Sequence, residues 1–181
     1  LYGLAEKILS KESMIRLWQG GTLEMGEVQG RCENYSCHLL LSDRCGGRHE
    51  GTFALKLVRT RDRVTLCTTR FTFVRQPQTK GPTFVVGSMQ GPKNSKRLIV
   101  EATRDLSGLR PKEALLMVLQ GLVAEGRAKH FLAVSEARHP IRYRRTKRRY
   151  MMLSDIDGFW YERSGVPDGP YGFVVPYSRI D

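Results

Sequence analysis

The sequence predicts an α+β domain built around a central, mostly antiparallel sheet. Residues 22–91 contain four or five short runs rich in Val, Thr, Phe and Leu, separated by clusters of turn-forming residues. From residue 92 to residue 126 the apolar residues recur at helical spacing instead. A block of strands followed by helices is the order of an α+β fold. We expect one domain over residues 1–181, and the start at Leu1 suggests trimmed ends.

The first 91 residues predict helix and then a meander of strands. Residues 1–21 carry spaced apolar residues and close on two glycines, which favours one helix or two short ones. Within the meander, Phe53, Leu55 and Leu57 alternate with other residues, and so do Phe71 and Phe73. Alternation with a period of two indicates antiparallel strands with one covered face.

Two helices and a buried strand are expected next. The first helix accepts Pro92 in its opening turn and stops at Gly108, a candidate left-handed residue. The second opens at Pro111, carries a continuous apolar stripe and ends at Gly126. The run at residues 130–134 has the length and composition of a buried strand.

The C-terminal part predicts a short helix and a last strand. The helix should cover residues 155–163, with Ser154 and Asp157 spaced as a capping pair and Gly165 at its end. Residues 171–177, rich in aromatic and β-branched residues, are expected to form the last strand.

The net charge is the most unusual property of the composition. Thirty Lys and Arg residues face 18 Asp and Glu, which gives a formal charge of +12. Such a surface attracts polyanions, whether nucleic acid, anionic lipid or an acidic protein. No apolar run reaches the length of a membrane span, and four cysteines are too few for a disulfide scaffold. We therefore expect a cytoplasmic protein with reduced thiols.

The turn ahead of the second helix is a candidate anion site. Gly108 precedes the helix, and Arg110 and Lys112 flank its first turn, where they could clamp phosphate oxygens. No established phosphate-loop motif is present. The alternative is a plain corner, in which Gly108 ends one helix, Pro111 starts the next and both cations are solvated.

The exit of the buried strand holds the candidate catalytic residues. Ser135, Glu136 and His139 gather where ligands often bind in mixed sheets. His139 could act as a general base oriented by the Glu136 carboxylate, or it could be a structural histidine bonded to a neighbouring loop. Since no G-x-S-x-G motif surrounds Ser135, a serine hydrolase is not expected.

A basic segment follows at residues 138–150, with two tyrosines among its cations. It could bind nucleic acid, anionic lipid or nothing but solvent. The candidate polyanion-binding residues are Arg142, Arg144, Arg145, Lys147, Arg148 and Arg149.

A metal site is not predicted. The soft ligands within residues 32–49 have spacings unlike those of structural zinc sites, and strand cysteines are commonly core residues, so zinc is only a third alternative. These ligands are Cys32, Cys37, His38, Cys45 and His49.

Four sequence blocks carry a family resemblance. They are VVGSMQGP at 85–92, LSGLRPK at 106–112, LAVSEARH at 132–139 and SDIDGFWYERSG at 154–165. In this order and spacing they resemble the VirK/YbjX family of bacterial proteins. The resemblance implies an association with virulence and with resistance to cationic antimicrobial peptides, without an established activity.

The order of elements is also similar to that of GNAT-type acyltransferases. In that fold the turn before the long helix holds the pyrophosphate of acyl-CoA, and here this turn contains Gly108, Arg110 and Lys112. The resemblance implies a donor that is acyl-CoA or, since the GNAT glycine loop is missing, the phosphopantetheine of an acidic acyl-carrier protein. We therefore expect an acyltransferase-like enzyme in envelope modification, peripheral at the inner membrane. The rival is a non-catalytic basic module that binds anionic membrane or, less favoured, nucleic acid.

Overall fold

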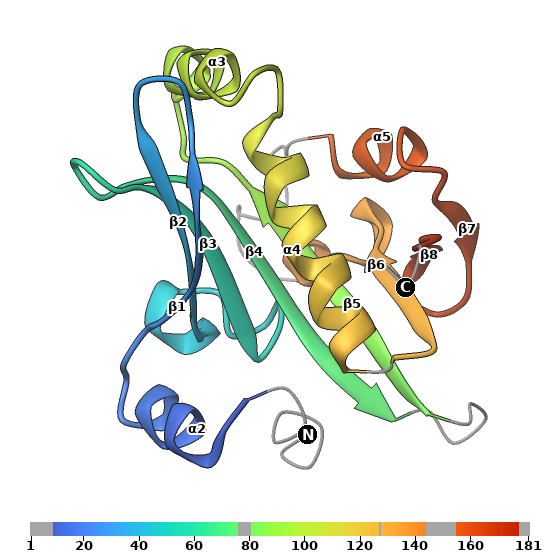
Figure 1. Cartoon of the computed structure of the whole chain (residues 1–181). Helices are drawn as coiled ribbons and strands as arrows, with labels where there is room; N and C mark the ends of the chain where they lie inside the picture. The colour runs from blue at the N-terminus through green and yellow to red at the C-terminus, as the bar shows by residue number, and fades with distance from the viewer. Residues whose placement is uncertain (1–8, 76–80, 127, 144–154, 178–181) are drawn as a thin grey trace.

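The computed structural model describes residues 9–75, 81–126, 128–143 and 155–177 (Figure 1). Four α-helices lie in these ranges: α2 (Lys11–Trp18), α3 (Lys96–Asp105), α4 (Pro111–Glu125) and α5 (Ile156–Tyr161). The strands are β1 (Leu23–Gln29), β2 (Asn34–Leu41), β3 (Phe53–Arg59), β4 (Val64–Arg75), β5 (Pro82–Gln90), β6 (His130–Val134), β7 (Val166–Asp168) and β8 (Gly172–Val174). Short 3-10 helices are η1 (Ser42–Cys45), η2 (Glu136–Arg138) and η3 (Pro140–Tyr143).

The eight described strands form one sheet in the order β1-β2-β3-β4-β5-β6-β8-β7. Neighbouring strands are antiparallel except β5 and β6, which run parallel. A parallel pair needs a long crossover, and α3 and α4 supply it. The prediction of an α+β fold around a mostly antiparallel sheet is confirmed.

A row of phenylalanines marks the face of the sheet that α4 covers. Phe53, Phe71, Phe84 and Phe131 come from four adjacent strands, and their ring centroids lie 5.7, 4.9 and 5.3 Å apart in that order. Stacked aromatic pairs of this kind add to the free energy gained from burial alone. Figure 1 shows α4 lying across this face, and the buried side chains of α4 belong to the same core cluster as the phenylalanines. The predicted alternation of β3 and β4 therefore orients their large side chains toward α4.

The corner between α3 and α4 differs in detail from the expectation. α3 begins at Lys96 rather than near Pro92, because residues 92–95 form a turn with Asn94 at φ +54°. Ser107, at φ +57°, is the left-handed residue directly after the cap of α3. Gly108 follows at φ +96°, and its N–H donates to the carbonyl of Thr103. These contacts form a Schellman motif, one position earlier than predicted.

The C-terminal helix is also capped by a different residue. Asp155, not Ser154, is the N-cap of α5, and its carboxylate accepts a hydrogen bond from the N–H of Gly158 at 2.7 Å. Ser154 lies outside the described residues. The last strand is β8, and β7 beside it was not predicted. Among the described helices none is long and apolar enough to cross a membrane.

The loop between β2 and β3 passes behind the sheet, on the face away from α4. It approaches so closely that a Cβ on Gly51 would lie 2.6 Å from the backbone nitrogen of Phe71. A Cβ on Gly87 of β5 would lie only 1.7 Å from the carbonyl oxygen of Glu50. Glycine at these two positions lets backbone meet backbone, so the loop reaches across β4 to β5.

Candidate functional site at the divergence of β5 and β6

The parallel strands β5 and β6 part in the middle of the sheet. They pair from Thr83 opposite His130 to Val86 opposite Ala133. β6 ends one residue later, at Val134, while residues 88–90 of β5 pair only with β4 among the described strands. Ligands of open α/β sheets bind where neighbouring strands diverge at their carboxyl ends. The divergence is therefore the first place to look for a site.

A narrow crevice lies at this divergence. It encloses about 10 Å³, which is room for one water molecule. Both strands and the helices α4 and α5 contribute to its walls. The lining residues are Val86, Gly87, Ser88, Met89, Lys112, Val134, Ile156, Phe159 and Trp160.

Lys112 is the cation of the crevice. It stands on the first turn of α4, is partly buried, and has its Nζ 5.6 Å from the centroid of the Phe159 ring. No carboxylate among the described residues lies within ion-pair distance of it. The charge also acts on the Cys67 thiol, whose pKa burial raises to about 12 while Lys112 lowers it. A partly buried ammonium with only an aromatic partner can bind an anion.

Arg110 lies on the same turn but points into an ion-pair network. Its guanidinium is 3.1 Å from Glu113 and 3.1 Å from Glu162, and Arg163 pairs with the same two carboxylates. The backbone N–H of Arg110 donates to Glu113 at 3.1 Å. Partial burial raises the pKa of Glu113, but hydrogen bonds from Arg110 outweigh it and leave that pKa below its usual value. The Glu113 carboxylate therefore already occupies the N-terminus of α4, where a bound anion would otherwise lie.

The other residues predicted for the phosphate turn have different surroundings from Lys112. Gly108 has open space around the position of a Cβ, and Arg110 is engaged by acids. Pro111 starts α4 as expected. The phosphate-binding role of Gly108 and Arg110 stays a prediction.

A polar cluster lies directly behind the crevice. The Ser88 hydroxyl donates to Glu50 Oε2 at 2.6 Å, and Arg70 donates to the same oxygen at 3.1 Å. Arg70 also donates to the carbonyl of Cys45. The second carboxylate oxygen of Glu50 lies 3.6 Å from His139 Nε2. Ser88 thus joins the crevice wall to a chain that runs through Glu50 to His139.

His139 is fully buried, with a side-chain exposure of 0%. Its Nδ1 accepts a hydrogen bond from the backbone N–H of Ile141 at 3.3 Å. A neutral imidazole that accepts at Nδ1 carries its proton at Nε2, which faces Glu50. The geometry lets His139 orient Glu50.

Glu136 belongs to a different set of contacts. Its carboxylate pairs with Arg142, and its backbone N–H donates to Asp157 at 2.8 Å. Asp157 was predicted to pair with Ser154 as a cap. The Glu136 carbonyl accepts a hydrogen bond from the backbone N–H of His139 at 3.2 Å, while its carboxylate pairs with Arg142, so a catalytic role for that carboxylate stays a prediction. The basic residues Arg144, Arg145, Lys147, Arg148 and Arg149 lie outside the described residues.

The sequence reasoning missed Glu50, Arg70 and Ser88. A signal existed for two of them, because Arg70 interrupts a strand of Thr and apolar residues and Ser88 interrupts an apolar run. Glu50 carried none, since it follows His49 in a stretch that indicates only a turn.

The cysteines and histidines of residues 32–49 point to different places. Cys32 is exposed, Cys37 is buried in a strand, and Cys45 donates to the carbonyl of Ser42. His38 shares a hydrogen bond with Ser36 at 2.8 Å. Over the described ranges, no three Cys, His, Asp or Glu side chains gather as metal ligands would.

Comparison with known proteins gives a family and no activity. The model of a family described as "Protein of unknown function (DUF535)" matches residues 2–179 of the chain. No curated protein matches the sequence. No solved structure matches it either.

Proposed function

We propose that this chain, which belongs to the DUF535 family of proteins of unknown function, is an acyltransferase-like enzyme that uses an acyl thioester donor. The observation that carries the proposal is the position of Lys112. A partly buried ammonium, without an acidic partner among the described residues, lines the crevice where two parallel strands part. Such a charge suits a phosphate or another anionic part of a donor.

The unpaired edge of β5 supports a thioester donor in particular. Residues 87–90 have no second strand beside them among the described strands. A phosphopantetheine arm contains amide groups that can hydrogen-bond to an open strand edge as an added strand would. The order of elements in the sequence resembles that of GNAT-type acyltransferases, and this resemblance favours acyl-carrier protein or acyl-CoA as the donor. Because the crevice holds only about one water molecule, α5 has to move when the donor enters.

The cluster behind the crevice would handle the proton. The nucleophile of the acceptor forms a bond to the acyl carbon, and the bond from that carbon to sulfur breaks. The proton of the nucleophile passes through the Ser88 hydroxyl to the Glu50 carboxylate and then to the departing thiolate. Arg70 and His139 hold Glu50 in place. Glu50 and Ser88 thereby take the role that the sequence suggested for Glu136 and His139.

The physiological setting comes from the resemblance to VirK/YbjX proteins. That resemblance favours an acceptor in the bacterial envelope and a contribution to resistance against antimicrobial peptides. An acidic acyl-carrier protein or an anionic lipid surface would complement the net charge of +12. The protein would then work in the cytoplasm, peripherally at the inner membrane.

A non-catalytic basic module is the second candidate, and the excess of 30 Lys and Arg over 18 Asp and Glu favours it. In that case binding to anionic membrane or nucleic acid would follow total charge and fall steeply with salt. It would not depend on any single lysine of the crevice.

A thermal-shift experiment separates the two candidates. Wild type, Lys112→Ala and the charge-matched control Lys96→Ala are heated with acyl-CoA, with acyl-carrier protein and with heparin. A donor at 100 times its Kd stabilises the fold by about 2.7 kcal/mol, which is about 5–11 °C for a chain of this length. We expect this shift in wild type and Lys96→Ala and its loss in Lys112→Ala. Equal shifts in all three proteins, or a shift with heparin alone, would favour the basic module.

A further inference from the structure

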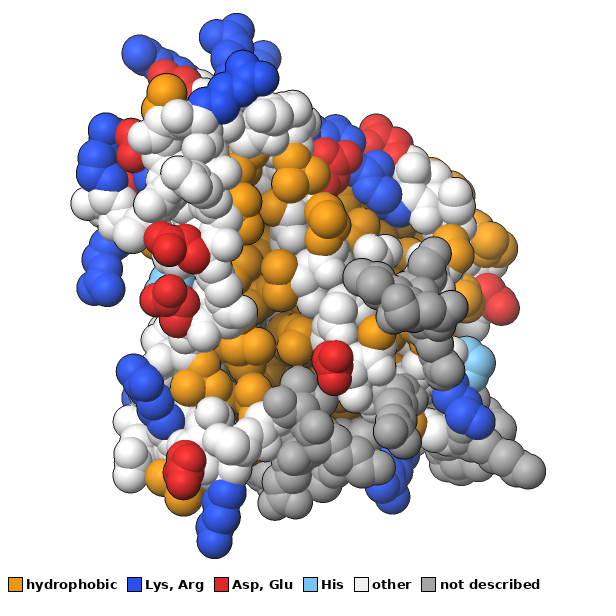
Figure 2. Space-filling model, viewed as in Figure 1, with side chains coloured by type: hydrophobic (Ala, Val, Ile, Leu, Met, Phe, Trp, Pro, Cys, Tyr) orange, Lys and Arg blue, Asp and Glu red, His pale blue; other side chains and the backbone are white. Residues whose placement is uncertain are grey.

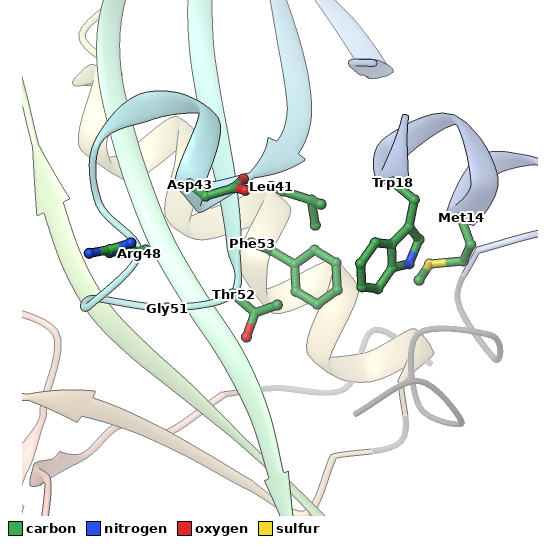
Figure 3. A pocket seen from close by; sticks show the side chains of 8 residues that line it. All are labelled: Met14, Trp18, Leu41, Asp43, Arg48, Gly51, Thr52 and Phe53. Atoms are coloured by element: carbon green, nitrogen blue, oxygen red, sulfur yellow. The ribbon is translucent and has the colours of Figure 1, made fainter. Parts of the chain in front are cut away.

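An apolar pocket lies at the other end of the sheet, between α2 and the start of β3 (Figure 3). Its volume is about 300 Å³, at the lower limit of small-molecule sites. Figure 2 shows apolar side chains gathered in the hollow between α2 and α4. The lining residues are Met14, Trp18, Leu41, Asp43, Arg48, Gly51, Thr52 and Phe53.

The two sides of the pocket differ in chemistry. Met14, Trp18, Leu41 and Phe53 form an apolar side, and the indole of Trp18 lies across the gap from the Phe53 ring in Figure 3. Trp18 is 53% exposed, whereas Met14 is buried against the core. An apolar ligand that entered the gap would remove more of the exposed indole from water, which is favourable.

The polar side comes from one loop, residues 43–52. Asp43, Arg48 and Thr52 line the pocket there. The same loop carries Glu50 of the polar cluster. Two residues of chain span at most about 7 Å, so the Thr52 backbone is within that distance of Glu50. A ligand with its polar end on this loop would place that end near the proposed chemistry.

We propose that this pocket holds the single unbranched acyl chain of the substrate, with its polar end on the loop 43–52. The inference rests on the proposed acyl transfer. A methylene fills about 30 Å³, close to the volume per molecule in liquid water, so about 300 Å³ accommodates a chain of about ten carbons. Apart from the indole N–H of Trp18, the apolar side carries only hydrocarbon and thioether groups, which fits an alkyl chain.

Quenching of tryptophan fluorescence tests the position of the bound acyl chain. The protein has two tryptophans, Trp18 at the pocket and Trp160 buried in the core at 2% exposure. Undecanoic acid brominated at its last carbon serves as the probe, because bromine quenches an indole that it touches. We expect saturable quenching in wild type, reversed by unbrominated decanoic acid. The Trp18→Phe variant, which reports on Trp160 alone, should show no quenching.

A matched pair of variants tests the pocket itself. Thr52 and Thr72 share a hydrogen bond between their hydroxyls at 3.1 Å. Thr52→Phe breaks this bond and fills the pocket, whereas Thr72→Val breaks it and leaves the pocket open. We expect the affinity for the brominated acid to fall at least tenfold in Thr52→Phe and to stay within twofold in Thr72→Val. Equal affinity in both variants, or equal quenching in Trp18→Phe, overturns the inference.

Two further ligands with the same acyl chain, acyl-pantetheine and a lysophospholipid, show whether the bound chain belongs to the donor or to the acceptor. Stronger competition by the thioester identifies the donor, and stronger competition by the lipid identifies the acceptor; both support the pocket. If acyl-carrier protein still stabilises the fold through Lys112 while the brominated acid leaves Trp18 unquenched, the pocket inference fails and the proposed function stands. Quenching at Trp18 without any effect of donor or Lys112→Ala keeps the pocket and refutes acyl transfer.

Discussion

The contact between the loop 43–52 and β5 depends on Gly87. Replacing Gly87 by alanine tests how strongly this contact positions the polar cluster of Glu50, Ser88 and Arg70. A Cβ at this position would lie 1.7 Å from the Glu50 carbonyl oxygen, whereas real Cβ contacts stay beyond 3.0 Å. The Glu50 backbone must therefore move by more than an ångström. That movement strains the bonds from Ser88 and Arg70 to the Glu50 carboxylate, at 2.6 and 3.1 Å.

The cost of Gly87→Ala follows from two effects. Overpacking costs about 1–3 kcal/mol, and weakening a hydrogen bond to a charged group adds about 1–2 kcal/mol. We expect the free energy of unfolding to fall by about 2–5 kcal/mol, which lowers Tm by about 4–20 °C for this chain length.

Urea and thermal unfolding followed by circular dichroism measure the change. Gly121→Ala is the control, because Gly121 lies within α4 and has open space around its Cβ position. In a helix alanine is favoured over glycine, so this variant should gain about 0.5–1 kcal/mol. If Gly87→Ala is as stable as wild type while Gly121→Ala behaves as expected, the loop does not lie against β5 and the cluster is not assembled as described.

Two further predictions concern ionisable groups. Burial raises the pKa of Asp105, but hydrogen bonds from Tyr35 and from the backbone N–H of Cys32 outweigh it and hold that pKa below its usual value. Asp105→Asn should therefore lower the free energy of unfolding, with its whole effect present above about pH 4 and a shrinking effect at lower pH. A difference between variant and wild type that stays constant in urea unfolding from pH 2 to pH 7 would contradict this. Burial raises the pKa of Cys37 to about 11 and of Cys67 to about 12, so iodoacetamide at pH 8 should label the exposed Cys32 and spare both until the protein unfolds, as peptide mass spectrometry would show. Labelling of Cys67 at the rate of Cys32 would mean that β4 is not covered.

The fold could be predicted because its signals are local. Alternation in β3 and β4, the apolar stripe of α4 and the short apolar run of β6 each reflect the burial of one face of one element. The boundaries were less certain, since the left-handed residue after α3 is Ser107 rather than Gly108, and the N-cap of α5 is Asp155 rather than Ser154. Neighbouring turn residues can exchange such roles, and sequence spacing alone does not decide between them.

The candidate site could be predicted only in part because its contacts are distant in sequence. Glu50 and Ser88 are 38 positions apart and meet because a loop crosses the back of the sheet. The residues around Glu50 contain no pattern that predicts this path of the loop. Lys112 was identified from its place on a helix start, but the partners of Arg110 depend on how α5 packs. Glu162 is 52 positions away from Arg110 and forms an ion pair with its guanidinium, which the sequence analysis had expected to bind a ligand.

Hydrogen exchange at residues 87–90 of β5 tests the central claim most directly. The claim is that a thioester donor enters between β5 and β6 beside Lys112. With a non-transferable acyl-pantetheine or acyl-carrier protein added, amides of residues 87–90 should exchange more slowly in wild type and remain unchanged in Lys112→Ala. Unchanged exchange at residues 87–90 in wild type, at a donor concentration that saturates binding, would contradict the account.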